Sequence, residues 1–297
     1  MRAALSEATL DWVRAETGAD AVVDSQLLAG GITSDIRVLT LCGGSHLDEV
    51  VLRRMTVQPW RQHAAGLLQR EADTQTFLAT TPIPAPELVA VDPGGDRAGE
   101  PSLLMTRLPG RPCLTGIDLD AVAAMLVTIH SARPAQRPRV FQIWTGPDRW
   151  IVPLWAQNPA LFRAAFARIA RPAPPGRRCF MHRDYQPGNV LFAGGKLCGV
   201  VDWVETSWGP PDLDFAHCQT NLALLEGVDT AAHWRGSYLS RGDELCDDPD
   251  YWAVVDAVSM LPDPAKLLGA WRAAGRSDLS VGIIRGRYEQ YLETLLG

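Results

Sequence analysis

The sequence has no run rich in lysine and arginine, and no apolar run of the ~20 residues that a membrane-spanning helix needs. Its formal net charge is −6 at pH 7, so bulk charge does not support binding to nucleic acid or to an anionic membrane. The first residues, MRAALSEATLDWVRAE, are amphipathic with early acidic residues, unlike a secretory signal peptide. We therefore expect a cytoplasmic protein without nucleic-acid or membrane partners. The sequence does not indicate an oligomeric state.

Closely spaced cysteine pairs are also missing. Six cysteines are scattered along the chain, and no two of them form a CxxC pair. A disulfide framework or a zinc site usually shows regular cysteine spacing, so we expect neither. The cysteines are expected to be buried free thiols in a reducing compartment.

Two common phosphate-binding motifs are absent as well. No G-x-x-x-x-G-K-[ST] segment occurs, which excludes a P-loop NTPase in its usual form, and no G-x-G-x-x-G segment indicates a Rossmann site. There is no internal repeat and no low-complexity tract. The 297 residues, 46% hydrophobic and 21% charged, are typical of a soluble globular protein with one large domain or two lobes.

The N-terminal part of the chain predicts a small β-rich lobe. A short helix is expected over residues 5–16. Three strands, Ser25–Leu28, Ile36–Leu41 and Glu49–Leu52, are separated by Gly-Gly turns, which indicates an antiparallel meander. A helix over Gln62–Leu78 should follow, and the apolar stretches LVAVD and SLLMT predict two further strands.

The remainder predicts a larger, mainly helical lobe. The Pro-Gly break in LLMTRLPG places the boundary between residues 1–107 and 108–297. In DLDAVAAMLVTIHS the apolar residues recur at helical spacing, with Asp118 as a plausible N-cap. His130, at the end of this stretch, is expected to be a hydrogen-bonded core residue.

The most informative stretch is MHRDYQPGNVLFAGGKLCGVVDW. Two apolar strands flank Ala-Gly-Gly-Lys, which predicts a hairpin that turns at Gly194-Gly195. Asn189 and Asp202 would then lie near each other at the open end of the hairpin. Asp184 precedes Asn189 closely, so the three side chains are expected to converge.

Such a set suits phosphoryl transfer. The oxygen of Asn189 and the carboxylate of Asp202 are hard ligands that Mg²⁺ accepts together with phosphate oxygens and water. A separate carboxylate, Asp184, can orient a hydroxyl group and accept its proton. H-x-D-x-x-x-x-N followed by a metal-binding Asp is the pattern of a kinase catalytic loop.

Further kinase parts occur upstream in the expected order. AGGITSD forms a glycine turn that can cover phosphates with backbone N–H groups. VVLRRM places Arg53, with Arg54 as a rival, where a cation should contact the phosphates, and Glu71 on the next helix can pair with it. LLMTRLPG resembles a hinge whose backbone at Thr106 and Leu108 would bind an adenine edge.

Together these parts resemble the aminoglycoside phosphotransferase and choline kinase-like family of small-molecule kinases. HRDYQPGNVLF followed by VVDW is close to that family's pattern, and the resemblance covers about residues 25–215. It implies an α+β, two-lobed, protein-kinase-like fold. A small antiparallel sheet would form the nucleotide-binding lobe, 1–107, with the hinge, and 108–297 would form the catalytic and substrate-binding lobe.

The resemblance also implies roles for single residues. Asp184 would be the catalytic base, and Asn189 and Asp202 would bind Mg²⁺. Arg53, held by Glu71, would contact the phosphates of ATP or GTP. The residues that would cover the phosphates are Gly30, Gly31, Thr33 and Ser34. His182 and Asp214 would hold the loops in place.

Two positions depart from the family pattern. Arg53 stands where many members carry lysine, and a planar guanidinium is not an equivalent group although it can bridge phosphate oxygens. Gln186 replaces a common histidine, which we expect to matter little.

The acceptor is less well indicated. Acidic residues outnumber basic ones from Cys179 to Asp263, whereas the reverse holds from 109 to 178. A localised acidic region can concentrate cationic substrates such as aminoglycosides or amino alcohols, although a solvated loop explains it equally well. The candidate acceptor-binding residues are Glu205, Asp212, Glu226 and Asp229.

The sequence therefore predicts a kinase that transfers the γ-phosphate of ATP or GTP to a hydroxyl group of a small molecule. One alternative is a catalytically inactive, kinase-like protein that binds a nucleotide or metabolite, which the arginine at position 53 leaves open. Another is a metal-dependent phosphohydrolase that uses His182, Asp184, Asp202 and His217. The latter does not explain the glycine turn and the hinge.

Overall fold

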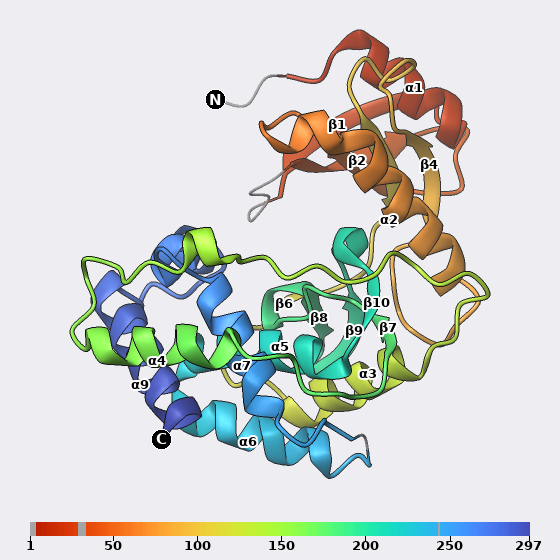
Figure 1. Ribbon diagram of the computed structural model, residues 1–297. Coiled ribbons are helices and arrows are strands. Elements are labelled where there is room, and N and C mark those ends of the chain that lie inside the picture. The colour runs from red at the N-terminus through yellow and green to blue at the C-terminus, as the bar shows by residue number, and fades with distance from the viewer. Residues whose placement is uncertain (1–3, 29–33, 243) are drawn as a thin grey trace. The chain divides into compact units, whose positions relative to one another are not determined.

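The computed structural model describes residues 4–28, 34–242 and 244–297. The chain forms two compact units. One consists of Met1–Gly110 with Cys198–Glu205, and the other of Arg111–Leu197 with Thr206–Gly297. The expected α+β class is confirmed, because a five-stranded antiparallel sheet dominates the first unit and helices dominate the second (Figure 1).

The first unit is built on a sheet with the strand order β1-β2-β3-β5-β4, in which all neighbours are antiparallel. The expected meander of the first three strands is confirmed, although β1 begins at Ala21 rather than Ser25. The helices and strands of this unit are α1 (Glu7–Thr17), β1 (Ala21–Leu27), β2 (Asp35–Cys42), β3 (Glu49–Arg54), α2 (Ala64–Leu78), β4 (Leu88–Asp92) and β5 (Ser102–Thr106).

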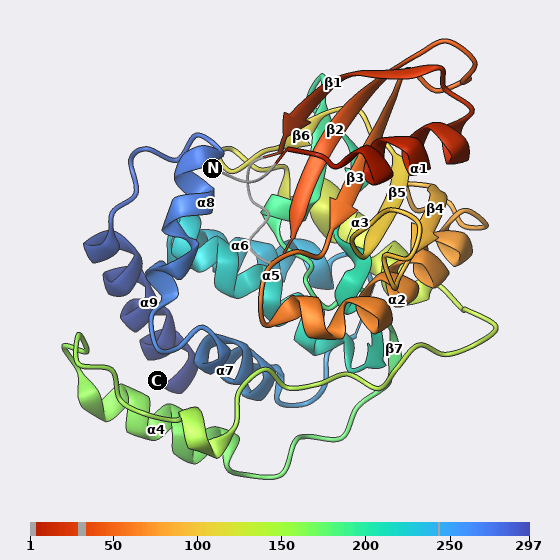
Figure 2. The same cartoon turned by 90° about the horizontal axis from the view of Figure 1, so that it is seen from above.

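This sheet is covered on both faces. Successive residues of a strand point to opposite faces, so Leu104 packs in one cluster with Trp12 of α1, whereas Leu103 packs in another with Leu68 of α2. The two helices can be followed in Figure 2. A sheet buried on both faces needs near-continuous apolar strands, which is what VVL and SLLM provide.

Residues 198–205, although late in the chain, are held within the first unit. The Val200 N–H donates to Pro84 O at 2.8 Å, and Arg70 Nη1 of α2 donates to Val204 O at 2.9 Å. Trp203 is fully buried, and its indole N–H donates to Val200 O at 2.9 Å. These contacts place Asp202 in the same unit as Arg53 and Glu71.

The second unit is mainly helical. Its short strands form the pair β10-β7 and the three-stranded order β6-β8-β9, and β9 begins in this unit and ends in the first. The helices and strands are β6 (Arg111–Pro112), α3 (Leu119–Ser131), α4 (Pro159–Ile169), β7 (Cys179–Met181), β8 (Val190–Ala193), β9 (Lys196–Val200), β10 (Ser207–Gly209), α5 (Pro211–Glu226), α6 (Val228–Leu239), α7 (Pro249–Ser259), α8 (Leu268–Ala273) and α9 (Val281–Leu296).

Two local predictions in this unit are confirmed. The hairpin of β8 and β9 turns at Gly194 and Gly195, whose φ angles of 56° and 76° are those that glycine adopts without strain. Asp118 caps α3, because its carboxylate accepts the Ala121 N–H at 2.9 Å.

Helix α5 lies in the centre of the second unit. It is buried from Pro211 to Leu225, and it packs against α6, α7 and α9. A helix buried on all sides is usually apolar. This one carries buried polar residues that need partners, namely Asp212, Asp214, His217, Gln219, Thr220 and Asn221.

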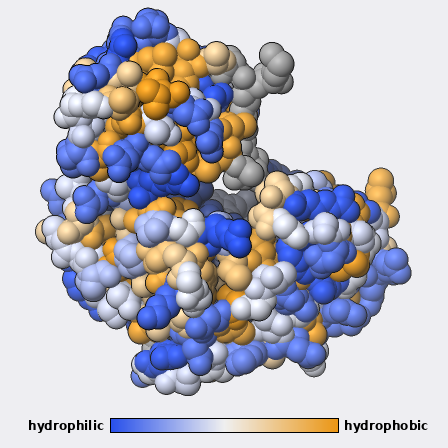
Figure 3. Space-filling model, turned by 180° about the vertical axis from the view of Figure 1, so that it is seen from behind, coloured by the Kyte–Doolittle hydropathy of each residue, from blue (hydrophilic) through white to orange (hydrophobic). Residues whose placement is uncertain are grey.

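The surface is of an ordinary mixed kind. Figure 3 shows hydrophobic and hydrophilic residues interspersed over the visible face of both units, as in most folded proteins. Within the described ranges, no helix combines the length and the apolar character needed to cross a lipid bilayer.

Candidate functional site

The first unit contains a buried cluster of one cation and two carboxylates. Arg53, at the end of β3, donates through Nη2 to Asp202 Oδ1 at 2.9 Å, and its Nε lies 3.4 Å from Glu71 Oε2 on α2. The side chains of Arg53 and Glu71 are 4% and 1% exposed, whereas that of Asp202 is 33% exposed. The expected pairing of Arg53 with Glu71 is therefore present, and Asp202 offers the accessible carboxylate.

Burial governs the ionisation of Glu71. It raises the pKa of the Glu71 carboxyl to about 7, and the charge of Asp202 adds to the rise. Arg53 and the backbone N–H of Trp203 oppose it. Arg53 is thus held between one carboxyl group that is costly to ionise and one that is accessible.

Arg54 points to a different partner. Its Nη2 donates to Asp35 Oδ2 of the neighbouring strand β2 at 3.1 Å, and both side chains are buried. Adjacent residues of a strand face opposite sides of the sheet, so only one of the two arginines can lie beside α2. The geometry therefore identifies Arg53, and not Arg54, as the cation that pairs with Glu71.

Several predicted nucleotide-binding residues belong to the rest of this unit. Gly30, Gly31 and Thr33 lie outside the described residues, and Ser34 is buried. Thr106 ends β5, where its N–H donates to Glu87 O at 2.9 Å. Leu108 follows it and is half-buried.

The second unit holds Asp184 and Asn189 together. Asn189 Nδ2 donates to Asp184 O at 2.8 Å and to Asp184 Oδ2 at 2.9 Å. Pro187-Gly188 forms the short 3₁₀ turn between them and delivers the chain to β8. The Asp184 side chain is 25% exposed, so its carboxylate keeps lone pairs toward solvent while the loop fixes its direction.

Two non-glycine residues, one in each unit, adopt the left-handed backbone conformation. Among the residues described, Arg183 (φ 73°) and Asp202 (φ 68°) are the non-glycine residues with positive φ. This conformation strains a side chain such as arginine, and it persists where surrounding contacts enforce it. One residue adjoins the expected base and the other is an expected metal ligand, so the strain coincides with the candidate site.

Asp214 of α5 supplies the enforcing contacts at Arg183. Its carboxylate accepts the backbone N–H of His182 at 2.8 Å and that of Arg183 at 2.7 Å. Burial by itself raises the pKa of Asp214, but His130, His182 and Arg183 together lower it below its ordinary value. His130 lies 3.4 Å from this carboxylate and 2.9 Å from Tyr238 Oη, as expected for a hydrogen-bonded core histidine.

We expect Asp214→Asn to lower the free energy of unfolding by about 2–5 kcal/mol, because an amide has one acceptor oxygen for two buried N–H donors. Urea unfolding at pH 7 measures this. Asp212→Asn is the matched control on the same helix, since Asp212 is equally buried but accepts from Cys246, whose N–H lies 2.8 Å away, rather than from the loop at 182 and 183. Equal losses in the two variants would contradict the clamp at residues 182 and 183.

Two residues that the sequence did not assign to this site complete it. His217 of α5 donates through Nε2 to Asp184 Oδ1 and through Nδ1 to Asp256 Oδ1 of α7, both at 2.9 Å. Burial opposes the charge of His217, but Asp256 and Asp184 raise its pKa to about 10. Burial likewise raises the pKa of Asp184, but His217, His182 and Asn189 bring it below its ordinary value. The sequence had singled out His217 only for a metal-dependent phosphohydrolase, and it had not singled out Asp256.

Asn189 and Asp202 each keep an oxygen of the kind that a hard divalent cation takes. Asn189 uses its amide nitrogen on Asp184, so its Oδ1 is the remaining donor, and Asp202 presents an accessible carboxylate. Across the described ranges, no three His, Cys, Asp or Glu residues gather as a metal site of their own. The two oxygens belong to separate units, so their joint use remains a prediction.

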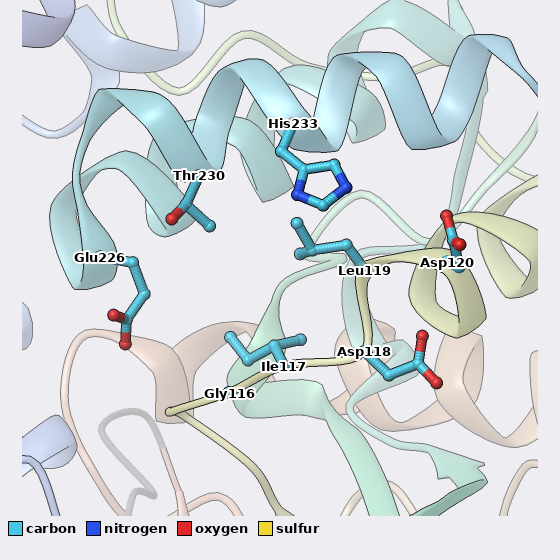
Figure 4. Close-up of a pocket in the computed structure, with 8 residues that line it drawn as sticks. All are labelled: Gly116, Ile117, Asp118, Leu119, Asp120, Glu226, Thr230 and His233. Carbon is cyan, nitrogen blue, oxygen red and sulfur yellow. The ribbon is translucent and has the colours of Figure 1, made fainter.

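The predicted acceptor-binding acids do not form one group. Asp212 is buried, and its carboxylate accepts the Cys246 N–H. Asp229 is exposed, and Glu205 is half-buried. Glu226 lies 2.6 Å from Arg276 and lines a pocket of about 400 Å³ in the second unit. Figure 4 shows this pocket between the segment 116–120 and α6.

The chain was compared with known proteins. A family model described as "Phosphotransferase enzyme family" matches residues 24–253. Homoserine kinase of Chelativorans sp. (strain BNC1) is 33% identical over 128 residues, which are 37% of this chain and 38% of that protein. The matched stretch therefore spans well under half of the curated relative.

Solved structures match over nearly the whole chain. A thermostable mutant of aminoglycoside phosphotransferase APH(4)-Ia, in ternary complex with AMP-PNP and hygromycin B, has a TM-score of 0.65 at 18% identity and covers 98% of this chain and 99% of that one. Macrolide 2'-phosphotransferase type I has a TM-score of 0.60 at 14% identity and covers 94% of each chain. These similarities confirm the kinase-like fold, and the family match over residues 24–253 shows that the chain belongs to the phosphotransferase enzyme family.

Proposed function

We propose that this protein is a small-molecule kinase that transfers the γ-phosphoryl group of ATP or GTP to a hydroxyl group of its acceptor. The observation that carries the proposal is the state of Asp184. Its carboxylate is held by Asn189 and His217, yet it remains 25% exposed beside a strained loop. A carboxylate with a fixed direction and free lone pairs suits the orientation of an attacking hydroxyl group.

In the proposed reaction the acceptor oxygen attacks the γ-phosphorus, and a new O–P bond forms. The bond from phosphorus to the β–γ bridging oxygen breaks, and the nucleoside diphosphate leaves with its electron pair. Asp184 accepts the hydroxyl proton. Bound Mg²⁺, held by Asn189 and Asp202, would neutralise the charge on the phosphate oxygens. Family membership and the neighbour that holds AMP-PNP support the nucleotide as co-substrate.

The first unit is proposed to bind the nucleotide. Arg53, fixed by Glu71, would contact phosphate oxygens, and the turn of Gly30, Gly31, Thr33 and Ser34 would cover them. The Thr106 N–H is already bonded to Glu87 O within the unit. The carbonyl oxygen of Thr106 and the N–H of Leu108 are therefore the hinge groups proposed for the adenine edge.

Arg53→Ala should raise the Kd for Mg·ATP roughly tenfold or more, because a charge-assisted contact to phosphate contributes about 1.5–3 kcal/mol. Isothermal titration calorimetry measures the change. Arg54→Ala is the control, since Arg54 is its neighbour on the same strand but pairs with Asp35. We expect it to destabilise the fold with little effect on the Kd of the folded protein. Equal Kd values for both variants would contradict the assignment of Arg53.

The acceptor is proposed to be a small molecule with a hydroxyl group and a positively charged amine, such as an amino alcohol or an aminoglycoside. The acidic surplus of residues 179–263 supports a cationic acceptor. The partial relative is a homoserine kinase, and one structural neighbour holds hygromycin B. Glu226 is the acid of the predicted set that lines a pocket.

A nucleotide-consumption screen tests the proposal. Purified protein with Mg·ATP or Mg·GTP is offered homoserine, other amino alcohols, hygromycin B, further aminoglycosides and uncharged sugars, and nucleoside diphosphate is measured. The expected result is acceptor-dependent release that requires Mg²⁺ and an amine-bearing alcohol. Nucleotide binding without turnover of any acceptor would favour the inactive binding protein instead. Dependence on a transition metal without nucleotide would favour the phosphohydrolase.

A further inference from the structure

A chain of three charged side chains runs from the surface of the second unit into its core. Asp184 is 25% exposed, His217 is 5% exposed and Asp256 is fully buried. The two 2.9 Å bonds of His217 join these carboxylates from opposite sides of the ring. Both ring nitrogens face carboxylate oxygens, and both can donate at once only when the ring is an imidazolium.

Core stability alone does not account for this arrangement. Burying a carboxylate is costly unless it is fully paired, and replacing buried ion pairs by apolar residues is often neutral or stabilising. Asp256 is fully buried, and in the described part of the chain its Oδ2 has no hydrogen-bond partner. The bond from His217 reaches only Oδ1 and leaves Oδ2 without a partner among the described residues. It therefore serves to orient the histidine rather than to complete the hydrogen bonding of the carboxylate.

Neighbouring groups hold the imidazole ring in place. The edge of Trp144 meets His217 with ring centroids 5.5 Å apart, and the guanidinium of Arg183 lies 3.7 Å over the Trp144 ring. From the same helix, Asn221 Nδ2 donates to His217 O at 2.8 Å. The ring is thus fixed by the catalytic loop, by α7 and by the segment before α4.

We propose that His217, oriented by Asp256, is a positioning residue that fixes the direction of the Asp184 carboxylate toward the acceptor. This inference rests on the proposed function, because it assigns Asp184 the role of accepting the hydroxyl proton. Neither His217 nor Asp256 is expected to touch the nucleotide. Their replacement should therefore change kcat rather than the KM for ATP.

The electrostatic surroundings favour the charged ring. Asp184 and Asp256 face it directly, and Asp184 is itself near His182. The titratable groups that interact with Asp256 are Lys266, Tyr288, Tyr291 and Cys218. Burial raises the pKa of Tyr288, Tyr291 and Cys218, so these groups stay neutral through the physiological range.

Kinetics of the intact protein provide the first test. Mg·ATP hydrolysis, with water as the acceptor, is followed from pH 5 to 10 in the wild type, His217→Gln and Asp256→Asn. We expect kcat to fall on the order of 10²-fold in both variants, with KM for ATP unchanged within about twofold.

Tyr288→Phe is the matched control. It removes a buried hydrogen bond of 2.9 Å to Ala257 O, on the helix that carries Asp256, and it removes none of the hydrogen bonds that join Asp184, His217 and Asp256. Its kcat should equal that of the wild type. A comparable loss in this control would show that disturbance of α7, rather than the orientation of Asp184, lowers the rate.

Nitrogen-15 NMR of the histidine side chains provides a second test that needs no turnover. In the wild type, His217 should carry protons on both nitrogens at pH 8 and lose one near pH 10. Asp256→Asn should lower that pKa by at least about one unit. A wild-type His217 that titrates near its ordinary value would overturn the proposal, even where its variants fold poorly.

The two hypotheses fail in different ways. If Asp184→Asn abolishes turnover while His217→Gln keeps the wild-type kcat, the kinase function stands and the positioning role is wrong. If the wild type shows no turnover while NMR finds His217 charged through Asp256, the proposed function fails. The three charged side chains would then be present without a role in positioning Asp184 for phosphoryl transfer.

Discussion

Asp184→Asn should lower kcat for phosphoryl transfer by roughly 10²–10⁴-fold, the usual contribution of a positioned general base. The amide keeps the shape of the side chain and a hydrogen bond to His217, but it cannot accept the hydroxyl proton. The Kd for Mg·ATP should stay within about twofold, because Asp184 is assigned to the acceptor. Initial-rate kinetics and calorimetry on the same preparation separate the two quantities.

Asp247→Asn is a suitable control for Asp184→Asn, because it removes the same charge from an exposed position of the second unit. It should leave both kcat and Kd unchanged. Retention of wild-type turnover by Asp184→Asn would overturn the assignment of the base. A parallel loss of nucleotide binding would show that Asp184 supports the nucleotide site instead.

The second large effect is expected at Asp202. Asp202→Asn should reduce the affinity for ATP in the presence of Mg²⁺ at least roughly tenfold, and it should leave the affinity without Mg²⁺ nearly unchanged. Asparagine tolerates left-handed backbone better than most residues, so the φ of 68° at this position is preserved while the charge is removed. Calorimetric titration of ATP with and without Mg²⁺ measures both values.

Asp35→Asn serves as the matched control for Asp202→Asn. Asp35 also accepts from an arginine of β3, Arg54, but it is buried away from Asp202. It should lower stability without removing the response to Mg²⁺. A Mg²⁺ response that survives in Asp202→Asn would count against its role as a metal ligand, and the buried contact with Arg53 would then be its whole function.

Much of the fold was predictable because its signals are local. Glycine pairs predicted the turns at Gly43-Gly44 and Gly194-Gly195, and short apolar runs predicted the strands of the first sheet. Asp118 was predictable as a cap because capping joins residues three positions apart. The helix expected over Gln62–Leu78 was found over Ala64–Leu78, a small error of the kind that fraying ends produce.

Asp184 and Asn189 were predictable as partners because they belong to one loop, and the structure joins them by two hydrogen bonds. Arg53 and Glu71 were predictable from the order of the kinase parts. Asp256 was not predicted, because its connection to Asp184 passes through His217 on another helix. The apolar residues around it, YWAVVDAV, indicate burial but not the partner of its carboxylate.

The sequence by itself determined the class of fold and the kinship with phosphotransferases, and it predicted the chemistry of HRDYQPGN and VVDW, because these depend on residue types and on spacing along the chain. The tertiary structure alone decided that Arg53 rather than Arg54 meets Glu71, and that His217 ties Asp184 to a buried aspartate. The alternation of side chains along β3 decides which arginine meets Glu71. The packing of α5 against α7 decides which carboxylates His217 meets. Both depend on contacts between residues far apart in the sequence, whose energies no local pattern records.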